Sequence, residues 1–279
     1  FFKQKTAYEI PKRDWSSDVC SSDLSFTSDS LRAYFREAYT PRNLIVSAVG
    51  NLEHDRVRRL VEERFGHLAP AGAAALEEPP LVVPKVLIRN KELEQSHVCL
   101  GASSYRQDHE DRYASYVLNT LLGGSMSSRL FQNVREKRGL AYAVFSGLSA
   151  YRDAGSFTVY AGCANEAVGE VVDLIVEELR TVKRVPVPAA ELQRAKDHLK
   201  GSLMLSLEST ASRMSHVARQ EIYFERQVGL DETLQGVERV TPEDVQRVAE
   251  DLFRDSSLSA TVLGNVNGLQ IPRERLALQ

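Results

Sequence analysis

The sequence predicts an α+β fold in which helices cover one face of a mainly antiparallel sheet. Apolar residues recur at helical spacing in several long segments, and short stretches of alternating residues lie between them. Two strand-like stretches, 141–150 and 155–163, are separated only by a turn and form a predicted hairpin. Most of the chain after this hairpin has a helical pattern, so strands and helices are grouped as in an α+β protein.

The first ordered segment is predicted to contain a helix, a strand and a second helix. Thr27 or Ser28 can cap a helix that carries apolar residues at helical spacing and is broken at 39–43. Residues 44–49 then predict a strand that ends at Gly50-Asn51, and a helix is expected at about 54–65.

A linker is predicted at 69–84, because its prolines cannot continue a helix or a central strand. The segment that follows the linker contains the remaining predicted elements. Strands are expected from 86, at 96–102, 141–150, 155–163 and 258–263, and helices at 110–122, from an Asn165 cap to Val182, at 189–207, 209–225 and 242–253.

The segments 31–51 and 245–265 share one plan, which is an amphipathic helix, a break, an apolar strand and Gly-Asn. A repeat of this kind predicts two related domains, with the first represented only by its end. The predicted organisation is therefore a remnant of the first domain at 25–68, the linker at 69–84 and a whole second domain at 85–279. Residues 1–24 lack periodicity and resemble the in-frame translation of a sequencing adapter, so we exclude them from the fold.

Composition excludes several classes of function. A net charge of −3 gives no electrostatic reason to expect nucleic-acid or anionic-membrane partners, and no apolar run approaches the length of a membrane helix. The three cysteines do not form a disulfide framework and favour a reducing compartment, so we expect a cytoplasmic location.

The most informative stretch runs from Gly123 to Tyr142. Gly123-Gly124 is predicted to end one helix, Ser127 or Ser128 to cap the next, and Gly139 to end it before a strand that begins near 141. Arg135 and Tyr142 would then lie on either side of a tight turn and could converge on one point. Two such donors are suited to stabilising an oxyanion, although a solvated arginine and a core tyrosine are the plainer interpretations.

This stretch resembles the second-domain motif of the pitrilysin/insulinase family of zinc peptidases, which includes the processing peptidases. The motif is Gly-Gly-x-Met-Ser-Ser-Arg-Leu followed by Arg-Glu-x-x-Gly-Leu-Ala-Tyr, and every position is present here. The resemblance implies that Arg135 and Tyr142 contact the scissile peptide, and that Gly123, Gly124 and Ser125 line the substrate. The segment at 39–51 is similar to the end of the family's first domain.

The family's zinc motif is H-x-x-E-H, and none of the six histidines begins one. The resemblance places zinc in the full-length protein but its ligands outside this chain, which we expect to be inactive alone. His97, Cys99 and Cys163 are the other conceivable metal ligands. A single H-x-C pair on a strand is more typical of ordinary sheet surface, so no metal site is predicted.

Two functions remain open from the sequence. In the first, the chain is a fragment of a zinc-dependent metalloendopeptidase that binds peptides and acts as a homo- or heterodimer with a zinc-bearing subunit. In the second, it belongs to a non-catalytic substrate-recognition or structural subunit of the same family. The intact loop motif with Arg135 and Tyr142 favours the enzyme.

Overall fold

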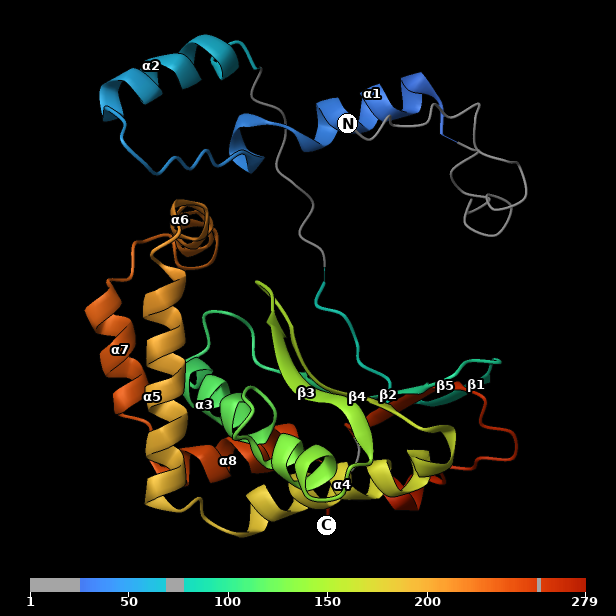
Figure 1. Cartoon of the computed structure of the whole chain (residues 1–279). Coiled ribbons are helices and arrows are strands. Elements are labelled where there is room, and N and C mark those ends of the chain that lie inside the picture. The colour runs from blue at the N-terminus through green and yellow to red at the C-terminus, as the bar shows by residue number, and fades with distance from the viewer. Residues whose placement is uncertain (1–25, 69–77, 255–256) are drawn as a thin grey trace, which may run out of the picture. The chain divides into compact units, whose positions relative to one another are not determined.

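The computed structural model describes residues 26–68, 78–254 and 257–279 (Figure 1). The described residues divide into two compact units, one built from 26–46 and 51–68 and the other from 47–50 and 78–279. The predicted adapter-derived segment and residues 69–77 of the linker lie outside the described residues.

The second unit contains a five-stranded sheet, and it confirms the predicted mainly antiparallel arrangement. The strand order is β1-β5-β2-β4-β3, and only the β1–β5 pair is parallel. The strands are β1 (Val86–Asn90), β2 (Ser96–Ser104), β3 (Ala141–Ala150), β4 (Gly155–Cys163) and β5 (Ser259–Gly264).

Six α-helices accompany this sheet: α3 (Arg112–Leu122), α4 (Val168–Arg184), α5 (Ala189–Ser206), α6 (Thr210–Phe224), α7 (Leu230–Glu238) and α8 (Pro242–Leu252). Helices α3, α4 and α8 contact strands and cover one face of the sheet, with α4 and α8 lying along it in Figure 1, whereas α5 and α7 pack on α3. The sequence analysis missed α7 and the short 3-10 helix at Arg273–Leu276. None of the helices in the described part of the chain is long and apolar enough to cross a membrane.

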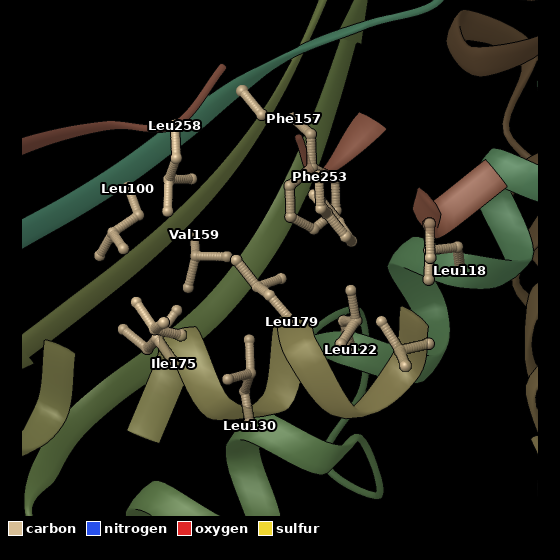
Figure 2. Packing of buried hydrophobic residues seen from close by; sticks show 14 of the residues in the cluster. Leu100, Leu118, Leu122, Leu130, Phe157, Val159, Ile175, Leu179, Phe253 and Leu258 are labelled. Atoms are coloured by element: carbon tan, nitrogen blue, oxygen red, sulfur yellow. The ribbon is translucent and has the colours of Figure 1, made fainter. Parts of the chain in front are cut away.

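The core lies between the sheet and these helices. Leu100 and Val159 project from the sheet toward Ile175 and Leu179 of α4, and all four side chains are almost completely buried (Figure 2). Because side chains alternate along a strand, the residues between the buried positions of β2 face the opposite side. That side carries His97 and is the face without the helical layer.

The first unit contains α1 (Ser28–Ala38), a 3-10 turn (Pro41–Asn43) and α2 (His54–Phe65), which confirms both predicted helices. The strand predicted at 44–49 is wrong, because these residues are irregular. A strand needs a hydrogen-bonded neighbour, and none of the described strands pairs with this segment.

The two repeated segments share their local geometry. Thr27 and Thr241 each form a capping box with the residue three positions later. The helices that they begin both contain 11 residues and end at an aromatic residue with similar backbone angles, φ −95° and ψ 68° at Tyr39 and φ −100° and ψ 63° at Phe253. The helices differ in their surroundings, because α1 has no buried residue whereas α8 buries four.

The predicted helix cap at Asn165 is wrong. The side chain of Asn165 instead accepts a hydrogen bond from Ser96 Oγ at 2.6 Å and donates one to the Leu93 carbonyl at 3.3 Å. A 3-10 turn at Asn165–Ala167 precedes α4, so the asparagine lies too early to cap it. Its amide links the start of β2 to the approach to α4.

The buried surroundings of α8 make its cap a test of the fold. We expect Thr241→Ala to lower the free energy of unfolding of the second unit by about 1 kcal/mol, because the Asp244 N–H loses its side-chain acceptor. Urea unfolding followed by circular dichroism measures this change. Thr27→Ala removes the same cap from a helix that buries nothing, so it should leave the urea midpoint of the second unit unchanged. An equal loss of stability in both variants would contradict the role given to the α8 cap.

Candidate functional site

The glycine loop after α3 is held against β3 by backbone contacts. The Ser146 N–H donates to the Gly123 carbonyl at 3.1 Å, and Ser146 Oγ donates to both the backbone and the side-chain oxygen of Asn119. A Cβ on Gly123 would lie 2.3 Å from Ser146 N, and one on Gly124 would lie 2.8 Å from Thr120 Cα. Both glycines are therefore explained by close backbone packing, with Gly123 buried and Gly124 exposed.

The serines that follow close a turn and do not cap the helix. Ser128 Oγ donates to the Ser125 carbonyl at 2.6 Å, and Ser127 Oγ lies 3.1 Å from Ser125 Oγ. The predicted cap at Ser127 or Ser128 is therefore wrong, because these hydroxyls satisfy the loop before the helix begins. The turn leaves Met126 with 76% of its surface exposed.

The short helix at Phe131–Glu136 has π geometry. Gly139 follows it at φ +63°, a left-handed conformation that favours glycine, as expected for the end of a helix. The Gly139 N–H donates to the Arg135 carbonyl, and the Leu140 N–H donates to the Val134 carbonyl at 3.0 Å. This last bond joins the end of the helix to the start of β3. π-helical turns are rare in proteins, and those that occur are often found at functional sites.

Tyr142 lies at an irregularity in the edge strand β3. Ala141 pairs with Cys163 and Ala143 with Gly162, so Tyr142 is an extra residue in this register. Such a bulge redirects a side chain away from the regular alternation of the strand. The Tyr142 side chain is 65% exposed, and in the described part of the chain its hydroxyl has no hydrogen-bond partner.

Arg135 is positioned by an aromatic ring rather than by an acid. Its guanidinium carbon lies 4.8 Å from the centre of the Phe131 ring, one turn earlier. Its closest carboxylate contact is 4.0 Å from Nε to Glu136, and 45% of its side chain is exposed. The sequence analysis missed Phe131, although the four-residue spacing of an aromatic and an arginine on a helix could have indicated it.

The neighbouring cations of the loop and helix have polar partners. Arg129 forms a bidentate ion pair with Glu191, in which Nε and Nη2 donate to the two carboxylate oxygens at 2.7 and 2.9 Å. This pair raises the pKa of Arg129. Lys137 donates to Asn133, and Arg138 pairs with Glu170 at 3.2 Å. Arg135 is therefore the cation of this run that retains most of its hydrogen-bonding capacity.

The conceivable metal ligands do not converge. Cys163 is fully buried on the helix-covered face, whereas Cys99 pairs with Tyr160 and lies on the other face. His97 Nδ1 is 2.8 Å from the Tyr160 hydroxyl. Burial raises the pKa of the Cys163 thiol to about 11 and raises that of Cys99 as well, which disfavours the metal-binding thiolates. Among the described residues, no three His, Cys, Asp or Glu side chains are placed to hold a metal ion.

Comparison with known proteins identifies relatives of this chain. A family model described as the peptidase M16 inactive domain matches residues 25–199. The chain is 41% identical over 238 residues to an uncharacterized zinc protease of Bacillus subtilis, an alignment that covers 85% of this chain and 58% of the relative. It is 39% identical over 258 residues to one of Streptomyces coelicolor, covering 89% and 56%. The chain thus spans a little over half the length of these relatives.

Solved structures show the same fold. A protease from Helicobacter pylori is 26% identical and superimposes with a TM-score of 0.75, covering 86% of this chain and 60% of that protein. A peptidase M16 inactive domain from Pseudomonas fluorescens is 23% identical, with a TM-score of 0.79 and coverage of 89% and 60%.

The packing of the glycine loop generates a stability prediction. We expect Gly123→Ala to lower the free energy of unfolding by about 1–3 kcal/mol, because its Cβ would overlap the Ser146 backbone. Gly147→Ala, on β3 beside Ser146, is the matched control, since nothing lies within 4 Å of a Cβ there. Chemical denaturation of both variants measures the difference; a similar loss in both would show that the Gly123 contact is unimportant.

Proposed function

This chain belongs to the M16 family of peptidases, and we propose that it supplies the substrate-binding second domain of a zinc-dependent metalloendopeptidase. The match to the M16 inactive domain and the zinc proteases among the relatives support this proposal. We further propose that residues 25–68 are the end of a first domain and that 85–279 are the second. The chain's coverage of only part of its relatives is in keeping with this organisation.

The observation that carries the proposal is the pair Arg135 and Tyr142. The Leu140 to Val134 hydrogen bond brings the backbone near both residues together, and both side chains are substantially exposed. A guanidinium and a phenol supply N–H and O–H donors, which are the groups that stabilise a developing oxyanion. A structural role alone would leave the hydrogen-bonding capacity of both groups largely unused.

We propose that the substrate is a peptide whose scissile carbonyl meets these two donors. As negative charge develops on the carbonyl oxygen, Arg135 and Tyr142 donate to it and lower the barrier. Gly123, Gly124 and Ser125 form the neighbouring loop, whose backbone the Ser146 contacts hold in place for the substrate to pass. No three possible ligands among the described residues are placed to hold zinc, and the sequence lacks H-x-x-E-H, so we propose that the zinc ligands and the general base lie outside this chain.

The zinc ligands belong to a segment encoded upstream or to a partner subunit. The protein is then a homodimer if the upstream segment carries the ligands, or a heterodimer with a zinc-bearing subunit, and Arg135 and Tyr142 act on a substrate held at the partner's zinc site. The alternative, a non-catalytic recognition or structural subunit, makes no use of an oxyanion pair. Arg135 variants therefore distinguish the two functions.

We expect Arg135→Ala to lower kcat by about 10²–10³ in the zinc-containing enzyme assembled with this chain, because one donor to the oxyanion is lost. Tyr142→Phe, which removes only the hydroxyl, should lower kcat in the same direction. Hydrolysis of a quenched fluorescent peptide measures both, and separate kcat and KM values show whether the loss occurs in the transition state.

Arg138→Ala is the matched control for these variants. It removes a cation of the same basic run, in the turn just after the helix, but one that is paired with Glu170, so kcat should change little. If Arg135→Ala and Tyr142→Phe retain full activity, the oxyanion role is wrong and the structural-subunit alternative gains support.

A further inference from the structure

A cavity of about 270 Å³ lies among the helices of the second unit, and none of its lining residues belongs to the short helix that carries Arg135. Its lining comes from α3, α5, α6 and α7 and from Gln107 and Val228 in the adjoining loops. In Figure 1 these helices stand together at one end of the unit. Its volume approaches the ~300–1,000 Å³ that is typical of small-molecule sites.

The cavity has mostly apolar and aromatic walls. Tyr113, Tyr116, Tyr223 and Phe224 surround it, and Leu199, Leu203 and Val237 complete the apolar surface. Two arginines, Arg112 and Arg219, also line it, and none of the described residues lining it is an aspartate or a glutamate. An apolar lining with cations but no acid is complementary to an apolar molecule that carries a negative charge.

Arg112 is the cation that is built into the wall. Its guanidinium carbon lies 4.4 Å from the Tyr113 ring centre and 5.2 Å from the Phe224 ring centre. Its donors bond the His109 carbonyl and the Tyr113 hydroxyl, both at 3.2 Å. An arginine has five N–H donors, so others remain available. The nearby acid, Glu232, forms its ion pair with Arg226 instead, which lowers the pKa of Glu232, and Arg112 adds to this lowering.

The site is preorganised on its other sides. Gln220 is 6% exposed and clamps the chain after α6, because its amide exchanges two hydrogen bonds of 2.9 Å with the backbone of Val228. Gly236 of α7 leaves the space that the Tyr113 ring occupies, since a Cβ there would lie 2.4 Å from the ring. Because these wall residues are already held in place, little side-chain conformational entropy is lost when a ligand binds.

We propose that this cavity binds a small carboxylic acid with an aromatic or branched aliphatic group. The carboxylate accepts hydrogen bonds from the free donors of Arg112, and the apolar group lies among the tyrosines and leucines. The same chemistry occurs at the C-terminal residue of a peptide that ends in an apolar amino acid. This site is independent of the proposed peptidase function, because it shares no residue with the Gly123–Tyr142 stretch.

The test is calorimetric titration of the 279-residue chain with hydrocinnamate, an apolar carboxylate, and with its neutral primary amide. We expect saturable binding of the acid at millimolar concentrations or below, and about tenfold weaker binding of the amide, because the charged hydrogen bonds are lost. A titration with a short peptide that ends in phenylalanine identifies the source, since tighter binding than hydrocinnamate would assign the site to peptide C-termini. The proposal is overturned if the titration with hydrocinnamate does not saturate, or if the acid and the amide bind equally well.

Two variants locate the binding. Arg112→Gln should weaken hydrocinnamate about tenfold, whereas Arg89→Gln, which changes an exposed arginine of β1 outside the cavity, should have no effect. Because Arg112 also packs on two rings, a second variant keeps the test independent of folding. Leu203→Trp fills the cavity, so it should abolish binding with no fall in the unfolding midpoint. Undiminished binding by either cavity variant would show that the ligand lies elsewhere.

Discussion

The contact between the Gly123 backbone and Ser146 is the constraint on which the candidate site depends. It fixes the end of α3 against the edge strand β3, and Ser146 Oγ reinforces it through Asn119. The loop that leaves Gly123 must then return to the start of the same strand. The turn closed by Gly139 is what brings Tyr142 near the helix that carries Arg135. A side chain at Gly123 would therefore disturb the site through the backbone.

The basic residues of the 135–138 run differ in their interaction partners, a difference that composition alone cannot show. Arg135, Lys137 and Arg138 look equivalent as a run of basic residues, and such runs usually form a solvated helix face. In the structure Arg138 is paired with Glu170, whereas Arg135 packs on Phe131 and keeps its donors available. Glu170, the partner of Arg138, is distant in sequence, so only the fold distinguishes Arg138 from Arg135.

Prediction from the sequence succeeded where local signals were strong. The hairpin of β3 and β4 and the capped start of α8 follow from alternation and capping residues. Helix α7 was missed because it is nine residues long, has no side-chain cap and contains Gly236, which lowers helix propensity. That glycine is required by the Tyr113 ring packed against it, a tertiary contact with no local signal. The motif gave the candidates Arg135 and Tyr142, but the hydroxyl of Ser128 and the amide of Asn165 have other partners that only the folded chain reveals.

The two repeated segments show how far local sequence determines structure. Thr27 and Thr241 begin helices of the same length with the same cap, so this level of structure is encoded locally. The conformation of the segment after each helix depends on its neighbours, since β5 is a strand between β1 and β2 whereas 44–49 is irregular. Leu31 at the matching position of α1 is 54% exposed, whereas Val245 of α8 is fully buried. By analogy with α8 and β5, we propose that α1 packs on a sheet of the proposed first domain and that residues 44–49 pair with strands of that sheet.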